Sequence, residues 1–214
     1  MNILVKSGKG FLAGRIRKKK KKKRLNITLC SRNKAKGLSK IDWNSPKKLN
    51  NLCKNVDVII NCAGLDSHRS KSLREAKKVN SVYPHKLFKA ASKNKVKLFI
   101  FLSTFHVYKT KSLINENTHL NKNSIYTLSK INGEKNLLQE ENSNTKVLIL
   151  RVCNLFGYPF YKNKNCWSLL INSIVKDLIT KKRFKIKSSM NEYRNYSSIK
   201  SFCEFIFNII NKIN

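Results

Sequence analysis

The sequence Leu-Phe-Ile-Phe-Leu-Ser-Thr occupies residues 98–104 and predicts the centre of a parallel sheet. Its first five residues are an apolar run of strand length, rich in aromatic and branched side chains, which is typical of a strand buried on both faces. The run turns polar at Ser103 and Thr104, so we expect both hydroxyls at the carboxyl end of the strand. Ligands bind at that edge of an open parallel sheet.

The next helical segment carries a phenol and an ammonium group that can reach the same edge. Tyr126 and Lys130 have i,i+4 spacing and therefore lie on one helix face, one turn apart. The spacing alone is weak evidence in a chain so rich in lysine. Two other pairs share it, Tyr158/Lys162 and Tyr196/Lys200. Tyr126 differs from the other two tyrosines because it opens a helix that follows a strand ending in hydroxyl residues. The alternative interpretation is that Tyr126 and Lys130 are an exposed pair on a Lys-rich helix without a functional role.

Apolar runs of strand length alternate with helix-length segments along most of the chain, which predicts an α/β fold with a doubly wound sheet. We expect strands at residues 2–6, 26–31, 39–42, 57–62, 97–103 and 146–153. A long helical segment is expected over 70–93, where Pro84 should kink the helix or mark a late start. The chain ends in an amphipathic helix with an apolar face made of Phe202, Phe205, Ile206, Ile209 and Ile210.

Composition limits the class of protein. A chain of 214 residues with 41% apolar residues suits one domain with a substantial core. The net charge of +35 would suit a polyanion such as nucleic acid, but the lysines are spread along the chain without a nucleic-acid motif, and we favour solvated lysines. The six cysteines lack metal-type spacing, so we expect no metal site and a reducing, cytoplasmic location. No signal-peptide region or membrane span is expected.

The segment Phe99–Tyr108, followed by Tyr126 and Lys130, resembles the extended short-chain dehydrogenase/reductase superfamily. Within it, the chain is most similar to the NAD-dependent epimerase/dehydratase family, whose nucleotide-sugar branch uses NAD or NADP. The resemblance implies a Rossmann-like doubly wound parallel sheet. Residues 1–154 would bind the dinucleotide, and residues 155–214 would form a short substrate-binding portion packed on them in one structural domain.

The resemblance also implies catalytic roles for the three residues already singled out. Tyr126 would be the general acid/base of an epimerase, dehydratase or reductase that transfers hydride to or from a nucleotide-sugar. Its free pKa near 10 is too high for a base at neutral pH, so a cation must favour the phenolate. Lys130 would supply this charge and also hold the nicotinamide ribose, and Thr104 would orient the reacting oxygen toward the phenol.

A Gly-rich turn follows the first predicted strand and enters a helix, the context that a dinucleotide pyrophosphate requires. In the family pattern G-x-x-G-x-x-G, Gly10 is in register, while Ser7 and Ala13 replace the first and third glycines. The expected cofactor-binding residues of this turn are Gly8, Gly10, Phe11 and Leu12. The lysine run 18–23 that follows is interpreted as a solvated surface.

Other residues that the resemblance assigns to the cofactor follow later strands. Arg32 stands where an acidic residue would bind the ribose hydroxyls, and its charge suits the 2′-phosphate of NADP, which favours NADP slightly over NAD. Asp42 would contact the adenine. Ala63 and Gly64 would let the dinucleotide pass close to the backbone, and Asn80 would lie near the nicotinamide, beside Tyr126 and Lys130.

The resemblance assigns two residues to the nucleotide-sugar. Asn154 follows a buried strand in a segment similar to R-x-x-N-x-x-G, and Arg194 resembles the arginine that binds the nucleotide diphosphate. Two alternatives stay open: a catalytically degenerate family member that serves as a binding scaffold, and a basic nucleic-acid-binding protein. A homodimer is also left open.

Overall fold

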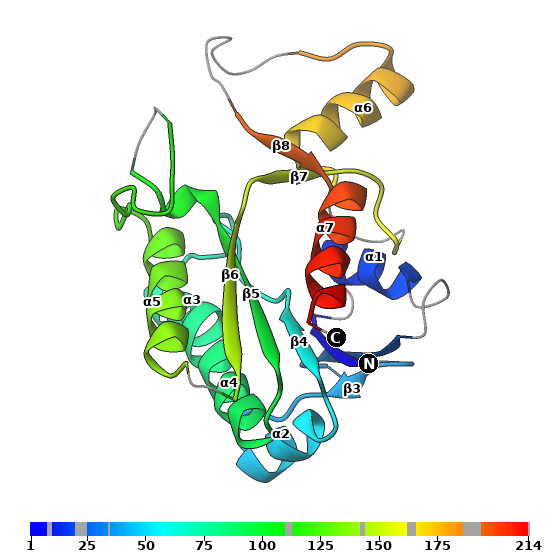
Figure 1. The fold of residues 1–214 in the computed structure, drawn as a ribbon. Helices are drawn as coiled ribbons and strands as arrows, with labels where there is room; N and C mark the ends of the chain where they lie inside the picture. The colour runs from blue at the N-terminus through cyan, green and yellow to red at the C-terminus, as the bar shows by residue number, and fades with distance from the viewer. Residues whose placement is uncertain are drawn as a thin grey trace.

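The computed structural model describes residues 1–7, 10–19, 25–33, 35–109, 113–141, 144–161, 166–185 and 194–213 (Figure 1). Its centre is a six-stranded sheet in the order β3-β2-β1-β4-β5-β6, in which neighbouring strands are parallel. The strands are β1 (Asn2–Lys6), β2 (Asn26–Ser31), β3 (Ser39–Lys40), β4 (Val58–Asn61), β5 (Leu98–Thr104) and β6 (Lys146–Val152). The predicted doubly wound parallel sheet is therefore confirmed. Only β3 is clearly shorter than expected, because the chain turns toward the next helix at Asp42.

Helices cover both faces of the sheet. The α-helices that the structure describes are α1 (Phe11–Lys19), α2 (Pro46–Cys53), α3 (Leu73–Lys77), α4 (Tyr83–Lys93), α5 (Ile125–Gln139), α6 (Leu170–Lys181) and α7 (Ile199–Asn211). Figure 1 shows α2 to α5 on one face and α1 with α7 on the other. In the ranges that the structure describes, no helix is long and apolar enough to cross a membrane. Lys20 to Lys23 of the lysine run lie outside those ranges.

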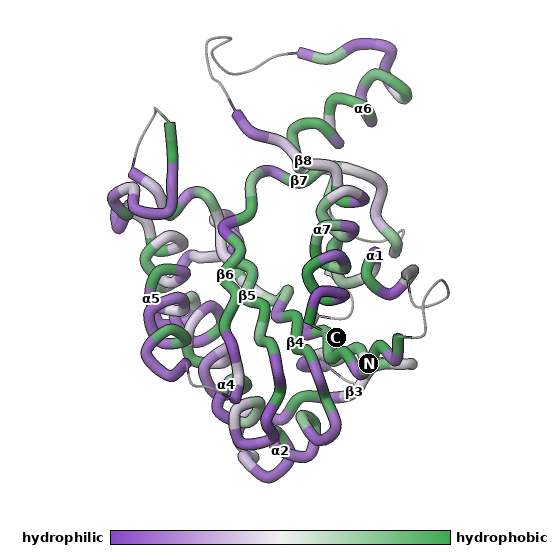
Figure 2. Tube along the Cα trace, viewed as in Figure 1, coloured by the Kyte–Doolittle hydropathy of each residue, from purple (hydrophilic) through white to green (hydrophobic). Residues whose placement is uncertain are grey.

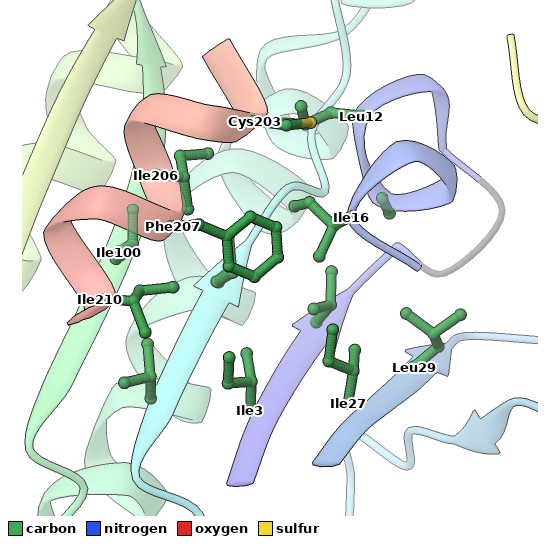
Figure 3. Close-up of a cluster of buried hydrophobic side chains, with 14 of the residues drawn as sticks. Ile3, Leu12, Ile16, Ile27, Leu29, Ile100, Cys203, Ile206, Phe207 and Ile210 are labelled. Atoms are coloured by element: carbon green, nitrogen blue, oxygen red, sulfur yellow. The ribbon is translucent and has the colours of Figure 1, made fainter. Parts of the chain in front are cut away.

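The central strands β1, β4 and β5 are buried on both faces because they carry apolar residues at almost every position, whereas β6 is only partly buried and β3 is exposed (Figure 2). In β1, Ile3 and Val5 join the cluster under α1 and α7, whereas Leu4 joins the cluster under α2 and α4. The apolar face of α7 completes the first cluster (Figure 3). Ile206 and Ile210 are fully buried there, which confirms the amphipathic C-terminal helix, whereas Phe205 is half exposed and its assignment to the apolar face was wrong.

The predicted helix over 70–93 is one helical stretch with an irregular middle. Between α3 and α4 lies a single π-helical turn, η1 (Lys78–Val82), which the sequence did not indicate. Pro84 lies in the first turn of α4, directly after this irregular turn. Proline is tolerated in the first turn of a helix. π-turns occur frequently at functional sites, and this one carries Asn80.

The chain beyond β6 adds a second, smaller sheet that was not predicted. Strands β7 (Asn154–Phe156) and β8 (Tyr196–Ser198) pair in parallel beyond the carboxyl edge of the main sheet, and α6 lies beside them (Figure 1). From β8 the chain returns into α7, which packs against α1. The division into residues 1–154 and 155–214 stays a prediction.

Candidate active site

The carboxyl end of β5 and the start of α5 meet at one edge of the sheet. Thr104 is the last residue of β5 and is almost fully buried. Helix α5 begins with a capping box, in which the side chains of Ser124 and Thr127 each accept a hydrogen bond from the other's backbone N–H. This cap places Tyr126 in the first turn, where its side chain lies close to that of Thr104. The structure therefore brings together two of the three predicted catalytic residues.

The electrostatic environment of the phenol differs from the sequence-based expectation. Burial raises the pKa of Tyr126, and the nearby Thr104 hydroxyl only partly opposes that effect. The charges that act on the phenol are those of Asp66 and Arg69. In this structure the phenol is thus held in its protonated form at neutral pH.

Lys130 lies one turn further along α5, and its side chain reaches the backbone of β5. Its Nζ donates a hydrogen bond of 2.8 Å to the carbonyl oxygen of Leu102 and lies 5.1 Å from the centroid of the Phe101 ring. Burial lowers the pKa of Lys130 to about 8, while Glu134 on the same helix raises it. The ammonium form therefore still predominates at neutral pH.

Gly64 closes the space beside Lys130. A Cβ atom at Gly64 would lie 2.9 Å from the Nζ of Lys130 and 3.0 Å from the Oδ1 of Asn80. Any side chain here would displace one of these two groups. Ala63, which precedes Gly64 in the segment after β4, is partly buried. The structure brings Gly64, Asn80 and Lys130 together.

Asn80 uses its amide to join three elements rather than to face solvent. Its Oδ1 accepts a hydrogen bond from the backbone N–H of Leu65 (2.8 Å), and its Nδ2 donates to the Leu65 carbonyl (3.1 Å). Nδ2 also donates to the hydroxyl of Ser129 (2.9 Å), which in turn donates to the carbonyl of Tyr126 (2.8 Å). Asn80 thus fixes the loop after β4 against the helix that carries Tyr126. Ser129 was not singled out from the sequence, because no motif marks it.

A second residue missed by the sequence analysis faces the phenol. His106 lies in the 3-10 turn η2 (Phe105–Val107), and its ring centroid is 6.5 Å from that of Tyr126. Burial lowers the pKa of His106, and the charge of Arg194 lowers it further. The charge of Arg194 therefore reaches His106, which lies beside Tyr126. Asn154 lies at the start of β7, where its Nδ2 donates to the carbonyl of Asn195, the neighbour of Arg194.

The turn after β1 has an unusual backbone. Ser7 has φ of 81°, a left-handed conformation that suits glycine, and it stands where the family pattern has its first glycine. Its carbonyl accepts a hydrogen bond of 2.6 Å from the N–H of Gly10. Phe11 and Leu12 then open α1, whose first N–H groups suit an anionic group. Gly8 lies outside the described residues.

Replacing Ser7 with glycine is expected to stabilise the protein by about 1 kcal/mol, because a non-glycine residue in this region is strained. Urea unfolding of the purified protein measures the difference. Ser7→Ala is the control, since it removes the hydroxyl and keeps the strain; we expect no such gain. Equal stability of Ser7→Gly and the parent chain would show that this turn is unstrained.

The residues predicted for the adenosine end are more exposed. Arg32 follows β2 and is solvent-exposed. Asp42 accepts a hydrogen bond from the N–H of Asn44 and forms an ion pair with Lys48, both at 3.1 Å. The hydrogen bond from Lys48 is the main cause of the lowered pKa of Asp42. No group of three or more His, Cys, Asp or Glu side chains in the described ranges could hold a metal ion.

Comparisons with known proteins identify the family. The chain matches the profile of the NAD dependent epimerase/dehydratase family over residues 3–214. Its fold is similar to MoeE5 in complex with UDP-glucose and NAD (TM-score 0.81, 16% identity, covering 97% of this chain and 71% of that one). It is also similar to UDP-N-acetylglucosamine 4-epimerase from Bacillus cereus (TM-score 0.77, 19% identity, 99% and 73%). A third similar structure is a dTDP-4-dehydrorhamnose reductase from Clostridium acetobutylicum (TM-score 0.78, 20% identity, 100% and 71%).

A search among curated proteins found no match. At identities of 16 to 20% the structural likeness shows the fold alone. The profile match spans nearly the whole chain and agrees with the resemblance stated above. This chain belongs to the NAD-dependent epimerase/dehydratase family.

Proposed function

We propose that this protein is an NAD- or NADP-dependent epimerase, dehydratase or reductase that acts on a nucleotide-sugar. One observation carries the proposal: the side chains of Thr104 and Tyr126 lie close together at the carboxyl edge of the sheet, and Lys130 follows one helical turn further along α5. A hydroxyl, a phenol and a cation at this edge suit proton transfer to and from a sugar hydroxyl. The similarity to nucleotide-sugar enzymes supports the same substrate class.

Each of the three residues has a distinct role in this proposal. Tyr126 exchanges a proton with the reacting hydroxyl through its phenolic oxygen. Thr104 holds that oxygen beside the phenol by a second hydrogen bond. The ammonium of Lys130 favours the phenolate if it leaves the Leu102 carbonyl and approaches the ring. Bound NAD or NADP would accept or donate the hydride.

The residues around the turn fit a dinucleotide. The first N–H groups of α1 suit a diphosphate, and the absence of a side chain at Gly64 makes room for the Lys130 ammonium and the Asn80 amide. In the proposal, Gly8, Gly10, Phe11 and Leu12 hold the diphosphate, and Ala63 and Gly64 line its path. Asp42 serves the adenosine, with its carboxylate shared with Lys48. Asn80 acts by positioning the loop at Leu65.

Arg32 is expected to favour NADP. Replacing Arg32 with alanine should weaken NADP binding by roughly 10-fold, because a charge-assisted hydrogen bond to the 2′-phosphate is lost, and should leave NAD binding unchanged. Isothermal titration with both dinucleotides measures the effect. Arg183→Ala, an exposed arginine beyond α6, is the matched control. A clear preference of the parent protein for NAD would remove this role of Arg32.

The reaction itself is tested by product analysis. The purified protein is incubated with NAD or NADP and a panel of nucleotide-sugars, and the products are separated and identified by NMR. We expect one substrate to be epimerised, dehydrated or reduced. Asn154→Ala and Arg194→Ala should raise KM for that substrate, since the proposal assigns both side chains to it.

A catalytically degenerate member that acts as a binding scaffold is the second candidate. The residue at position 7 favours this second candidate. Ser7 stands in place of a glycine in a left-handed conformation, and its side chain takes up space in the turn proposed to bind the diphosphate. A well-folded protein that binds neither dinucleotide would support this candidate over the enzyme.

A further inference from the structure

One helical turn beyond Lys130, a buried ion pair joins α5 to β6, and the proposed mechanism does not use it. Glu134 lies on α5 and Arg151 on β6, and their side chains are 4% and 21% exposed. The Nε of Arg151 donates to both carboxylate oxygens of Glu134 (3.3 and 3.1 Å), and Nη2 donates to Oε2 at 2.7 Å. Two of the three guanidinium nitrogens are therefore engaged by this carboxylate.

The third nitrogen of Arg151 reaches a different part of the chain, the connecting segment 105–123, of which the structure describes residues 105–109 and 113–123. Nη1 donates a hydrogen bond of 3.3 Å to the backbone carbonyl of Glu116. The guanidinium carbon also lies 4.8 Å from the centroid of the Tyr108 ring, within the range of a cation–π contact. One side chain thus joins β6, α5 and the connecting segment.

The connecting segment leads from one proposed catalytic residue to the other. It follows Thr104 directly and contains His106, whose ring centroid lies 6.5 Å from that of Tyr126. It ends before Ser124, the residue that caps α5 and so sets the position of Tyr126. The placement of this segment therefore affects the geometry between Thr104 and Tyr126.

Backbone hydrogen bonds within the connecting segment hold its two halves to each other. The N–H of Asn121 donates to the carbonyl of Val107 (2.6 Å), and the N–H of Lys109 donates to the carbonyl of His119 (2.8 Å). Neither of these bonds reaches the main sheet. Arg151 supplies such a tie, because its backbone belongs to β6 and its Nη1 bonds the segment.

A role in stability alone is the alternative for this ion pair. Burial of two charges costs desolvation free energy that their attraction roughly offsets, so a buried pair is weak evidence for stability. The geometry fits a different role. A planar guanidinium offers several donors in fixed directions, which an ammonium group does not. In Arg151 these donors meet a carboxylate on one element and a backbone carbonyl on another.

We propose that Arg151, held by Glu134, is a positioning residue that fixes the connecting segment, so that Thr104 and Tyr126 keep the geometry that proton transfer requires. This inference rests on the proposed function. In that function neither Arg151 nor Glu134 touches the substrate or the dinucleotide. A small displacement of a catalytic group slows the chemical step far more than it weakens binding. Loss of the tie should therefore lower kcat and leave KM nearly unchanged.

Arg151→Lys tests the inference most directly. It keeps a cation beside the Glu134 carboxylate and removes the fork that also reaches the carbonyl of Glu116. We expect kcat to fall about tenfold, with KM and dinucleotide affinity within about twofold of the parental values. Steady-state kinetics use the member of the nucleotide-sugar panel that the parent protein converts, with UDP-glucose tried first. Isothermal titration with NAD and NADP supplies the affinities.

Glu134→Gln is the second variant, because it keeps the shape of the side chain and removes the charge that holds Arg151. It should lower kcat by about threefold, since hydrogen bonds to a charged acceptor are the stronger ones. The double variant should lose no more kcat than Arg151→Lys alone, because the two side chains act as one unit. Lys89→Gln is the matched control: it breaks an exposed ion pair with Glu140 (3.2 Å) that joins α4 to α5, and it should retain parental kcat.

Hydrogen exchange followed by mass spectrometry provides a measurement that needs no substrate. In the full chain, residues 113–123 should exchange faster in Arg151→Lys than in the parent protein, because the segment has lost its tie to β6. The same residues should exchange at the parental rate in Lys89→Gln. Circular dichroism establishes that each variant is folded, and Glu134→Gln carries both measurements if Arg151→Lys does not fold.

Parental kcat in folded Arg151→Lys, or parental exchange of residues 113–123, would overturn the inference while leaving the proposed function intact. Lower stability in urea with parental kcat per folded molecule would mark a purely structural pair and would overturn the inference too. A folded parent protein that converts no nucleotide-sugar of the panel would instead overturn the proposed function.

Discussion

Replacing Tyr126 with phenylalanine is expected to lower turnover of a nucleotide-sugar by about 10²- to 10⁴-fold while changing dinucleotide affinity little. The substitution removes the hydroxyl that lies near Thr104 and keeps the ring at the start of α5. Because the hydroxyl acts on the reacting oxygen, the loss should fall on kcat rather than on KM. Steady-state kinetics and titration with the dinucleotide separate the two effects.

The chain offers two matched controls for this prediction. Tyr158 and Tyr196 share the Tyr-x-x-x-Lys spacing, but Tyr158 is an exposed residue after β7 and Tyr196 begins β8. Tyr158→Phe and Tyr196→Phe should retain parental turnover. Full activity of Tyr126→Phe would contradict the assignment of the acid/base.

Replacing Gly133 with alanine is expected to destabilise the protein by roughly 2 to 3 kcal/mol. Gly133 lies on the face of α5 that packs against the π-turn η1. A Cβ atom there would lie 2.3 Å from the backbone oxygen of Asn80 and 3.0 Å from the Cζ of Phe101. A backbone oxygen and a buried ring cannot move aside easily, so the helix must shift. Urea unfolding measures the loss.

Lys135→Ala, at an exposed position of the same helix, is the control for Gly133→Ala and should change stability by no more than about 0.5 kcal/mol. Where Gly133→Ala is folded, its turnover should also fall. The reason is that Asn80 joins the loop at Leu65 to Ser129 and, through it, to the backbone of Tyr126. Parental stability of Gly133→Ala would contradict the close packing of α5 on η1.

The sequence predicted the main sheet because its central strands are buried on both faces and therefore read as continuous apolar runs. Residues 98–104 are the clearest example, since five of them are apolar and the last two end the strand. The small sheet could not be predicted in the same way. Strands β7 and β8 are three residues each, partly buried, and paired across a long stretch of chain. The π-turn η1 likewise has no pattern of its own in the sequence.

The meeting of Thr104 with Tyr126 follows from strand and helix order alone, and so it could be predicted. The direction of the Lys130 side chain could not, because it depends on the Leu102 carbonyl and the Phe101 ring. The same holds for Asn80, whose amide is engaged by Leu65 and Ser129. Burial of Tyr126 and of Lys6 is a property of tertiary packing, and it sets the direction in which each pKa moves.

Dinucleotide binding by the purified protein tests the central claim most directly, since the proposed chemistry depends on it. Isothermal titration with NAD and with NADP is the measurement, with circular dichroism to establish that the protein is folded. The account predicts saturable binding of at least one dinucleotide, with one molecule per chain at saturation. A folded protein that binds neither NAD nor NADP would contradict it.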